Sequence, residues 1–176
     1  TTDRIVKGFN ASINSNSRVI NLSIGGPEDE SVGQMVDAAL KKGIIVVAAA
    51  GNGGPHGRPP YPATHPGVIA VTAIDRTSRP YSSATQGDFI SVSAPGVEIF
   101  TTSPGNTYRL VSGTSFAAAH VSGVIALLLE LEPSLLPGKV MSALESGAID
   151  IEPPGKDPMT GHGRLSTCRV IQSALK

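Results

Sequence analysis

The sequence contains only one cysteine, Cys168, among its 176 residues. A single cysteine cannot form a disulfide within the chain, and it excludes a zinc site built from several cysteines. We therefore interpret Cys168 as a small apolar residue of the last helix rather than as a reactive thiol.

An excess of charge of either sign is also missing, because 14 Lys and Arg balance 14 Asp and Glu. No summed field favours nucleic acid or an anionic membrane surface, so neither is expected as a partner. The longest aliphatic run, residues 44–50, is too short to span a bilayer. No signal-peptide pattern is visible, and the chain opens with Thr1 rather than Met, as a processed or excised chain would.

Apolar periodicity alternates between helix and strand along the first half of the chain. It predicts helices over residues 3–14 and 32–42, with buried strands over 18–23, 44–49 and 68–73. Strand, helix and strand in this order indicate a parallel crossover and an α/β fold. Later segments predict shorter strands at 89–93, 99–102 and 108–111, an apolar helix from 113 to 131, and helices around 140–144 and 165–175.

Ser115 lies where the strand-like run 108–111 turns through Gly113 into the apolar helix. Such a turn exposes a hydroxyl, and the helix N-terminus offers backbone N–H groups to a developing oxyanion. On this local pattern alone, Ser115 is better explained as a helix cap.

The segment Gly113-Thr114-Ser115-Phe116-Ala117-Ala118-Ala119-His120-Val121-Ser122-Gly123 resembles the nucleophile motif of the subtilisin-like serine proteases, with Ala119 where that family usually has Pro. Further blocks resemble the family in its own order. They are residues 19–26, 48–52, 61–63 with 68–71, 93–96 and 161–164.

This resemblance implies a three-layer α/β sandwich with a mostly parallel sheet, in which residues 1–176 form the C-terminal part of a subtilase catalytic domain. It implies a serine endopeptidase that hydrolyses polypeptides through an acyl-enzyme on Ser115. Asn52, otherwise an ordinary turn residue, becomes the oxyanion donor. The substrate-binding residues implied by the resemblance are Ser23, Ile24, Gly25, Ala49 and Gly51.

The family's catalytic Asp and His have no counterpart here. In the family they precede the substrate-binding strand, but residues 1–18 contain no His and only Asp3, which we interpret as a helix N-cap. His120 is expected to pack near Ser115, and His56 and His65 lie in Pro/Gly-rich loops. We expect that an upstream segment or a second chain supplies the Asp and the His, and that this chain alone is inactive.

Two other functions remain open at this point. Ser115, then Asp150 or Asp157, then His162 has the chain order of an α/β-hydrolase esterase triad, although the second Gly of its nucleophile elbow is lacking. A degenerate subtilase acting as a non-catalytic scaffold or binding module would also keep the family pattern.

The resemblance also suggests calcium and a secreted or cell-envelope location. The chain has no dense carboxylate cluster and no predicted metal-binding side chain, although carbonyls near Ala63, His65 and Val68 match a weak cation loop of some relatives.

The strand at 18–23 is apolar on both faces, so it belongs inside a sheet. The resemblance places its missing neighbours in the upstream segment. We therefore expect an unpaired edge at Arg18–Ser23 that contacts a second polypeptide and makes the isolated chain unstable or self-associating.

Overall fold

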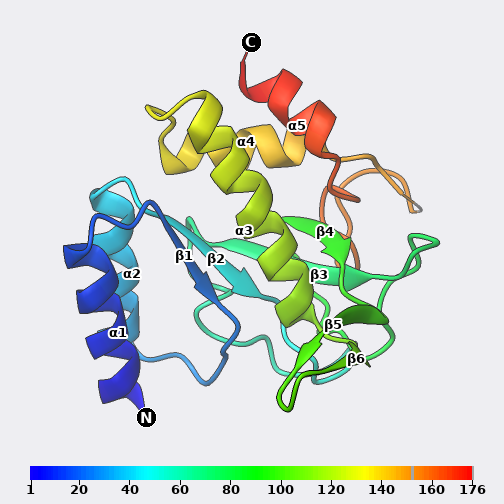
Figure 1. Ribbon diagram of the computed structural model, residues 1–176, viewed down its shortest axis with the longest axis horizontal. Helices are drawn as coiled ribbons and strands as arrows, with labels where there is room; N and C mark the ends of the chain where they lie inside the picture. Colours follow the sequence, from blue (N-terminus) through cyan, green and yellow to red (C-terminus); the bar gives the residue numbers. More distant parts are fainter. Residues whose placement is uncertain (152, 176) are drawn as a thin grey trace.

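The computed structural model describes residues 1–151 and 153–175. Its centre is an entirely parallel four-stranded sheet in the order β1-β2-β3-β4 (Figure 1). The strands are β1 (Val19–Leu22), β2 (Ile45–Ala49), β3 (Ile69–Ile74) and β4 (Val92–Pro95). The α/β class predicted from the sequence is confirmed.

One face of the sheet is covered by α2 (Glu30–Lys41), which connects β1 to β2, and by α1 (Thr2–Asn14), which packs against α2. Asp29 caps α2 by accepting a hydrogen bond from the Val32 N–H at 3.1 Å. The helix N-cap of α1 is Thr1, so the prediction for Asp3 is wrong. The helix begins earlier than expected, so Asp3 lies inside its first turn and pairs with Lys7, one turn further on, at 2.9 Å.

The opposite face carries α3 (Thr114–Leu131), with α4 (Pro137–Gly147) and α5 (Thr167–Ala174) beside it. Side chains along β2 alternate between the two faces, as a strand requires. Ile45, Val47 and Ala49 join the core under α3, whereas Val46 and Ala48 join the core under α1 and α2. Helices on both faces make the expected three-layer sandwich.

A two-stranded antiparallel hairpin precedes α3. It consists of β5 (Ile99–Ser103) and β6 (Thr107–Val111), and its second strand leads directly into the turn before α3 (Figure 1). One predicted boundary is wrong, because β4 starts at Val92 rather than at residue 89. The preceding residues form a turn, closed by the Ile90 N–H on the Gly87 carbonyl at 3.2 Å, which prevents them from extending.

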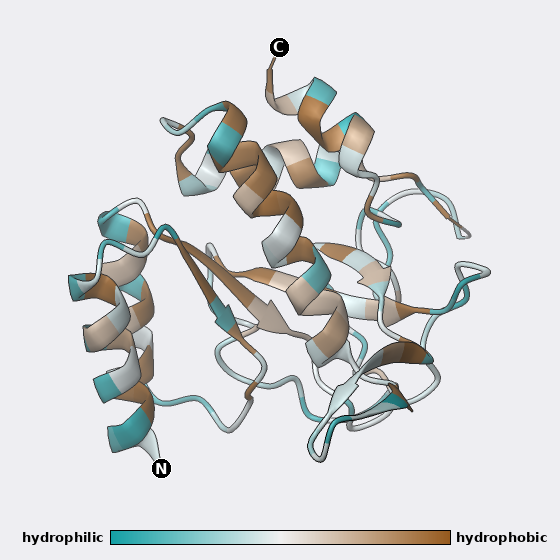
Figure 2. Cartoon of the chain, in the orientation of Figure 1, coloured by the Kyte–Doolittle hydropathy of each residue, from teal (hydrophilic) through white to brown (hydrophobic). Residues whose placement is uncertain are grey.

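Helix α3 is apolar around most of its circumference, with a mean hydropathy of 1.6 over 18 residues, and 39% of these residues are buried. Length and composition alone would let it cross a membrane, but a helix packed along a sheet passes the same test. Figure 2 shows hydrophobic residues along much of its length. Its outward face leaves Leu127 50% and Leu131 55% exposed.

Strand β1 forms the edge of the sheet, and within the described residues it pairs with β2 alone. A groove of about 570 Å³ runs between β1 and α1, where Ile5, Phe9, Ile20 and Leu22 contribute to its lining. The predicted strand 18–23 is shorter than expected, because β1 ends at Leu22. The apolar edge expected at this strand is present.

Candidate active site

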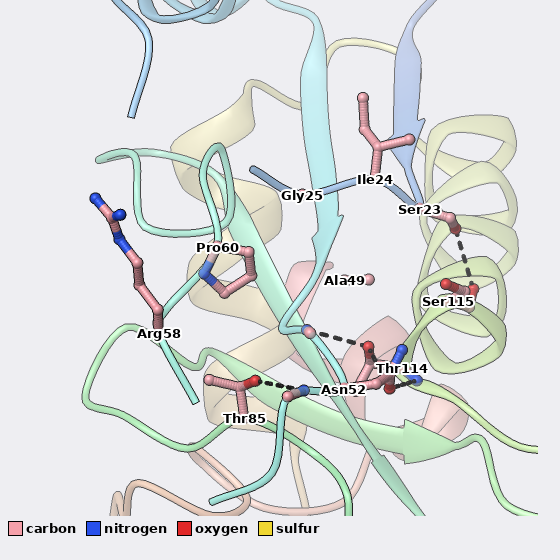
Figure 3. Close-up of a pocket in the computed structure, with 12 residues that line it drawn as sticks. Ser23, Ile24, Gly25, Ala49, Asn52, Arg58, Pro60, Thr85, Thr114 and Ser115 are labelled. Carbon is pink, nitrogen blue, oxygen red and sulfur yellow. Dashed lines mark hydrogen bonds between the residues drawn. The ribbon is translucent and has the colours of Figure 1, made fainter. Parts of the chain in front are cut away.

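A cleft of about 260 Å³ opens where the chain leaves the carboxyl ends of β1 and β2, beside the N-terminus of α3 (Figure 3). All of the site residues predicted from the sequence line it: Ser23, Ile24, Gly25, Ala49, Gly51, Asn52 and Ser115. Parallel strands bring these segments together because their carboxyl ends meet at one edge of the sheet.

Ser115 is placed by the turn that joins β6 to α3. Gly113, the N-cap residue, has φ 157° and ψ 155°, a region that is essentially restricted to glycine. Its N–H donates to the Gly96 carbonyl at 2.8 Å, which anchors the turn. Ser115 then stands in the first helical turn, where backbone N–H groups have no helical acceptor. Its hydroxyl makes no hydrogen bond with any residue in the described part of the chain.

Asn52 follows β2 and is held by Thr114. Its side-chain oxygen Oδ1 accepts from the Thr114 N–H at 3.0 Å and from the Thr114 hydroxyl at 3.2 Å. With the oxygen occupied in this way, the Nδ2 amide is the end that remains available for the cleft. Asn52 therefore presents a hydrogen-bond donor on the same side of the sheet as Ser115.

Thr114 has a second function in the same network, which the sequence did not indicate. Its hydroxyl also accepts from the Gly51 N–H at 3.1 Å, and its side chain is completely buried. It thus ties the end of β2 to the start of α3. The Gly-Thr-Ser triplet was visible in the sequence, but the inward direction of the threonine was not.

The walls of the cleft are backbone. A Cβ at Gly25 would lie 2.6 Å from Pro60 Cβ, and one at Gly51 would lie 3.0 Å from Pro60 Cγ, so the Pro60 ring packs against the segments that follow β1 and β2. Thr85 holds the segment after β2 in place, because its hydroxyl accepts from the Gly53 N–H at 3.2 Å. Sequence reasoning missed five lining residues: Gly53, Arg58, Pro60, Thr85 and Thr114.

No histidine in the described residues lines this cleft. His120 was expected to pack near Ser115, but it is exposed, and its Nδ1 lies 2.9 Å from the Phe116 carbonyl oxygen. Five residues along a helix correspond to a rotation of about 140°, which carries His120 away from the Ser115 side. His65 packs edge-on against Tyr61, with ring centroids 5.8 Å apart.

The esterase arrangement is not assembled either. The backbone N–H of His162 donates to the carbonyl of Ser91, the residue just before β4. His162 therefore lies at the amino ends of the strands, opposite the cleft. Asp157 accepts from the Met159 and Thr160 N–H groups within its own turn, and Asp150 accepts from Gly155. None of these three residues contributes to the cleft around Ser115.

The expected calcium has weak support from the residues present. The described residues contain no group of three His, Cys, Asp or Glu side chains able to hold a metal ion. The loop 63–68 contains no Asp or Glu, and its His65 carbonyl already accepts from the Val68 N–H at 3.1 Å. This donor set does not fit a strong calcium site, which uses carboxylates.

Comparison with protein families gives a match to the model of the subtilase family, peptidase S8, over residues 1–163. Among curated proteins, subtilisin DY of Bacillus licheniformis is 41% identical over 155 residues, covering 86% of this chain and 57% of its own length. Subtilisin E of Bacillus subtilis is 41% identical over 148 residues, covering 82% of this chain and 39% of its own length.

Solved structures agree with this match. The prenylagaramide maturation protease PagA superposes with a TM-score of 0.90 at 28% identity, covering 99% of this chain and 68% of that one. Fervidolysin from Fervidobacterium pennivorans, a keratinolytic enzyme related to subtilisin, superposes with a TM-score of 0.89 at 31% identity. That match covers 97% of this chain and 29% of fervidolysin. The chain thus spans about half or less of the subtilisins that it matches.

Proposed function

Because the chain belongs to the subtilase family, we propose that it is the nucleophile-bearing part of a serine endopeptidase. The observation that carries this proposal is the shared cleft of Ser115 and Asn52, with a hydroxyl and an amide donor on one side of the sheet. Acyl transfer requires this combination of a nucleophile and an oxyanion donor.

In the proposed reaction, Ser115 Oγ forms a bond to the scissile carbonyl carbon while its proton passes to a base. The negative charge that develops on the carbonyl oxygen accepts hydrogen bonds from the Ser115 N–H and from Asn52 Nδ2. Collapse of this intermediate breaks the C–N bond, and the amine leaves with the proton that the base returns. Water then hydrolyses the ester on Ser115 by the same steps.

The peptide itself would be held as an added strand. The cleft is bounded by backbone at Ser23–Gly25 and at Ala49–Gly51, and its glycines keep side chains out of the way. Exposed backbone N–H and C=O groups can pair with an extended peptide in this manner. Ser23 also links the wall to the nucleophile, because its hydroxyl donates to the Ser115 carbonyl at 3.4 Å.

We propose that the base and its carboxylate come from a polypeptide segment outside this chain. Two surfaces that the described residues leave uncovered support that proposal. One is the unpaired edge of β1 with the groove beside α1, and the other is the outward apolar face of α3 near Leu127 and Leu131. A segment that pairs with β1 would lie beside the strand whose carboxyl end leads to Ser23 at the cleft. A secreted or cell-envelope location is proposed with it, on family resemblance alone.

Complementation tests the proposal. This chain is co-expressed with a segment that carries the missing Asp and His, and hydrolysis of a fluorogenic peptide is measured for the complex and for its Ser115→Ala variant. We expect hydrolysis that depends on Ser115. A stable complex that binds peptide but never cleaves it would favour the scaffold function instead. Robust hydrolysis by this chain alone that requires His162 would favour the esterase-type arrangement.

A further inference from the structure

We propose that the cleft selects substrates with an acidic residue, Asp or Glu, immediately before the cut, and that Arg58 is the residue that determines this specificity. The inference rests on the proposed peptidase function and adds its substrate class. It follows from the shape of the cleft and from the charges of its lining.

The shape limits which side chains can enter. The substrate side chain before the cut passes from the Ser115 end into the space between the two backbone walls. The Pro60 ring narrows that space opposite Ser115 (Figure 3). It lies close to both Gly25 and Gly51. Within residues 1–151 and 153–175, the only apolar side chains in the lining are those of Ile24, Ala49 and Pro60. A large aromatic or aliphatic side chain would therefore find little apolar surface.

The charge of the lining is one-sided. Among the residues that the structure describes, Arg58 is the only charged one that lines the cleft, and none of them brings a carboxylate to it. Its side chain is exposed and forms no ion pair with any acidic group in the described residues. Figure 3 shows it beyond Pro60, at the end of the cleft away from Ser115.

A guanidinium without a partner at the end of a short cleft favours an anionic side chain and disfavours a cationic one. Arginine also suits a carboxylate because its planar donors can bind both oxygens. We expect kcat/KM for the Glu peptide to exceed that for the isosteric Gln peptide by about tenfold. This factor lies between the effect of an exposed ion pair and the effect of a charge-assisted hydrogen bond.

The test uses the active complex and four peptide coumarin amides that differ only in the last residue, which is Glu, Gln, Lys or Phe. The measured quantity is kcat/KM. The unmodified complex should prefer Glu, and added salt should reduce the Glu/Gln ratio. Arg58→Gln should bring that ratio close to one, and Arg58→Glu should make Lys better than Glu. Arg169→Gln, which removes an exposed cation from α5, should leave the ratio unchanged.

A second variant tests the width of the cleft separately from the charge of Arg58. Pro60→Ala removes most of the ring that narrows the cleft, so hydrolysis of the Phe peptide should rise while the Glu/Gln ratio stays the same. The inference is overturned if Phe is preferred by the unmodified complex, or if Arg58→Gln leaves the Glu/Gln ratio unchanged while peptides are still cleaved. A complex that cleaves none of the peptides overturns the proposed function, and this inference with it.

Discussion

Asn52 and Thr114 lie 62 positions apart in the sequence, but two hydrogen bonds join them, since Asn52 Oδ1 accepts from both the N–H and the hydroxyl of Thr114. The same hydroxyl accepts from the Gly51 N–H. Thr114 is thus a positioning residue, which orients the amide proposed to act on the oxyanion.

Replacing Thr114 by Val tests this positioning. The substitution keeps the shape but removes the hydroxyl, so the Gly51 N–H loses its partner and Asn52 loses one of two. We expect a stability loss of about 1–3 kcal/mol in chemical denaturation. In the active complex, kcat should fall more than KM rises. Thr114→Ser keeps the hydroxyl and should stay near the parent in kcat; an equal loss of kcat in both variants would contradict the role of the hydroxyl.

Replacing Asn52 by Ala tests the oxyanion donor. In the active complex, we expect kcat to fall by about 10²–10³ with little change in KM, the loss known for an oxyanion donor in a subtilisin. Steady-state kinetics on a single peptide would measure it. Hydrolysis that is indifferent to Asn52 would remove this residue from the proposed mechanism.

The chain by itself should hydrolyse peptides at a negligible rate. Without a base to accept the Ser115 proton, the loss should approach about 10⁶, as it does when triad residues are removed from subtilisin. The measurement is peptide hydrolysis by the purified chain beside Ser115→Ala. Turnover well above that variant would show that a base is already present in this chain.

Replacing Gly113 by Ala should impair the turn that carries the nucleophile. The φ of 157° with ψ of 155° is one that a residue with a Cβ rarely adopts, so the substitution should cost about 1–3 kcal/mol and displace Ser115. Thermal unfolding and kcat of the complex would both register this. Gly123→Ala, at an exposed position within α3 where a Cβ meets nothing within 4 Å, is the matched control and should be neutral or stabilising.

The free edge of β1 should make the isolated chain self-associate. The Ile45 N–H bonds to the Arg18 carbonyl, and because strand residues alternate in direction, the Asn21 N–H points away from β2. Asn21→Pro removes that donor without disturbing the pairing with β2, so it should reduce association. Analytical ultracentrifugation compares the two proteins. An isolated parent chain that is monomeric across the concentration range would contradict the prediction.

The sequence by itself predicted the α/β class and nearly all of the elements, because the relevant signals are local. The short, β-branched apolar run 44–49 predicts a strand covered on both faces, as β2 is. The motif around Ser115 and the block ending at Asn52 likewise identified residues that line one cleft. The boundary of β4 could not be read, since a turn closed by a single hydrogen bond looks like an apolar strand in the sequence.

Only the tertiary structure decided how distant segments meet. It placed His162 at the amino ends of the strands and His120 on the exposed side of α3, so neither lies at Ser115. It also brought Pro60 against Gly25 and Gly51, which narrows the cleft. A sequence pattern records which residue a position carries. The direction of its side chain, and what that side chain meets, depend on how the parallel strands and α3 pack against one another.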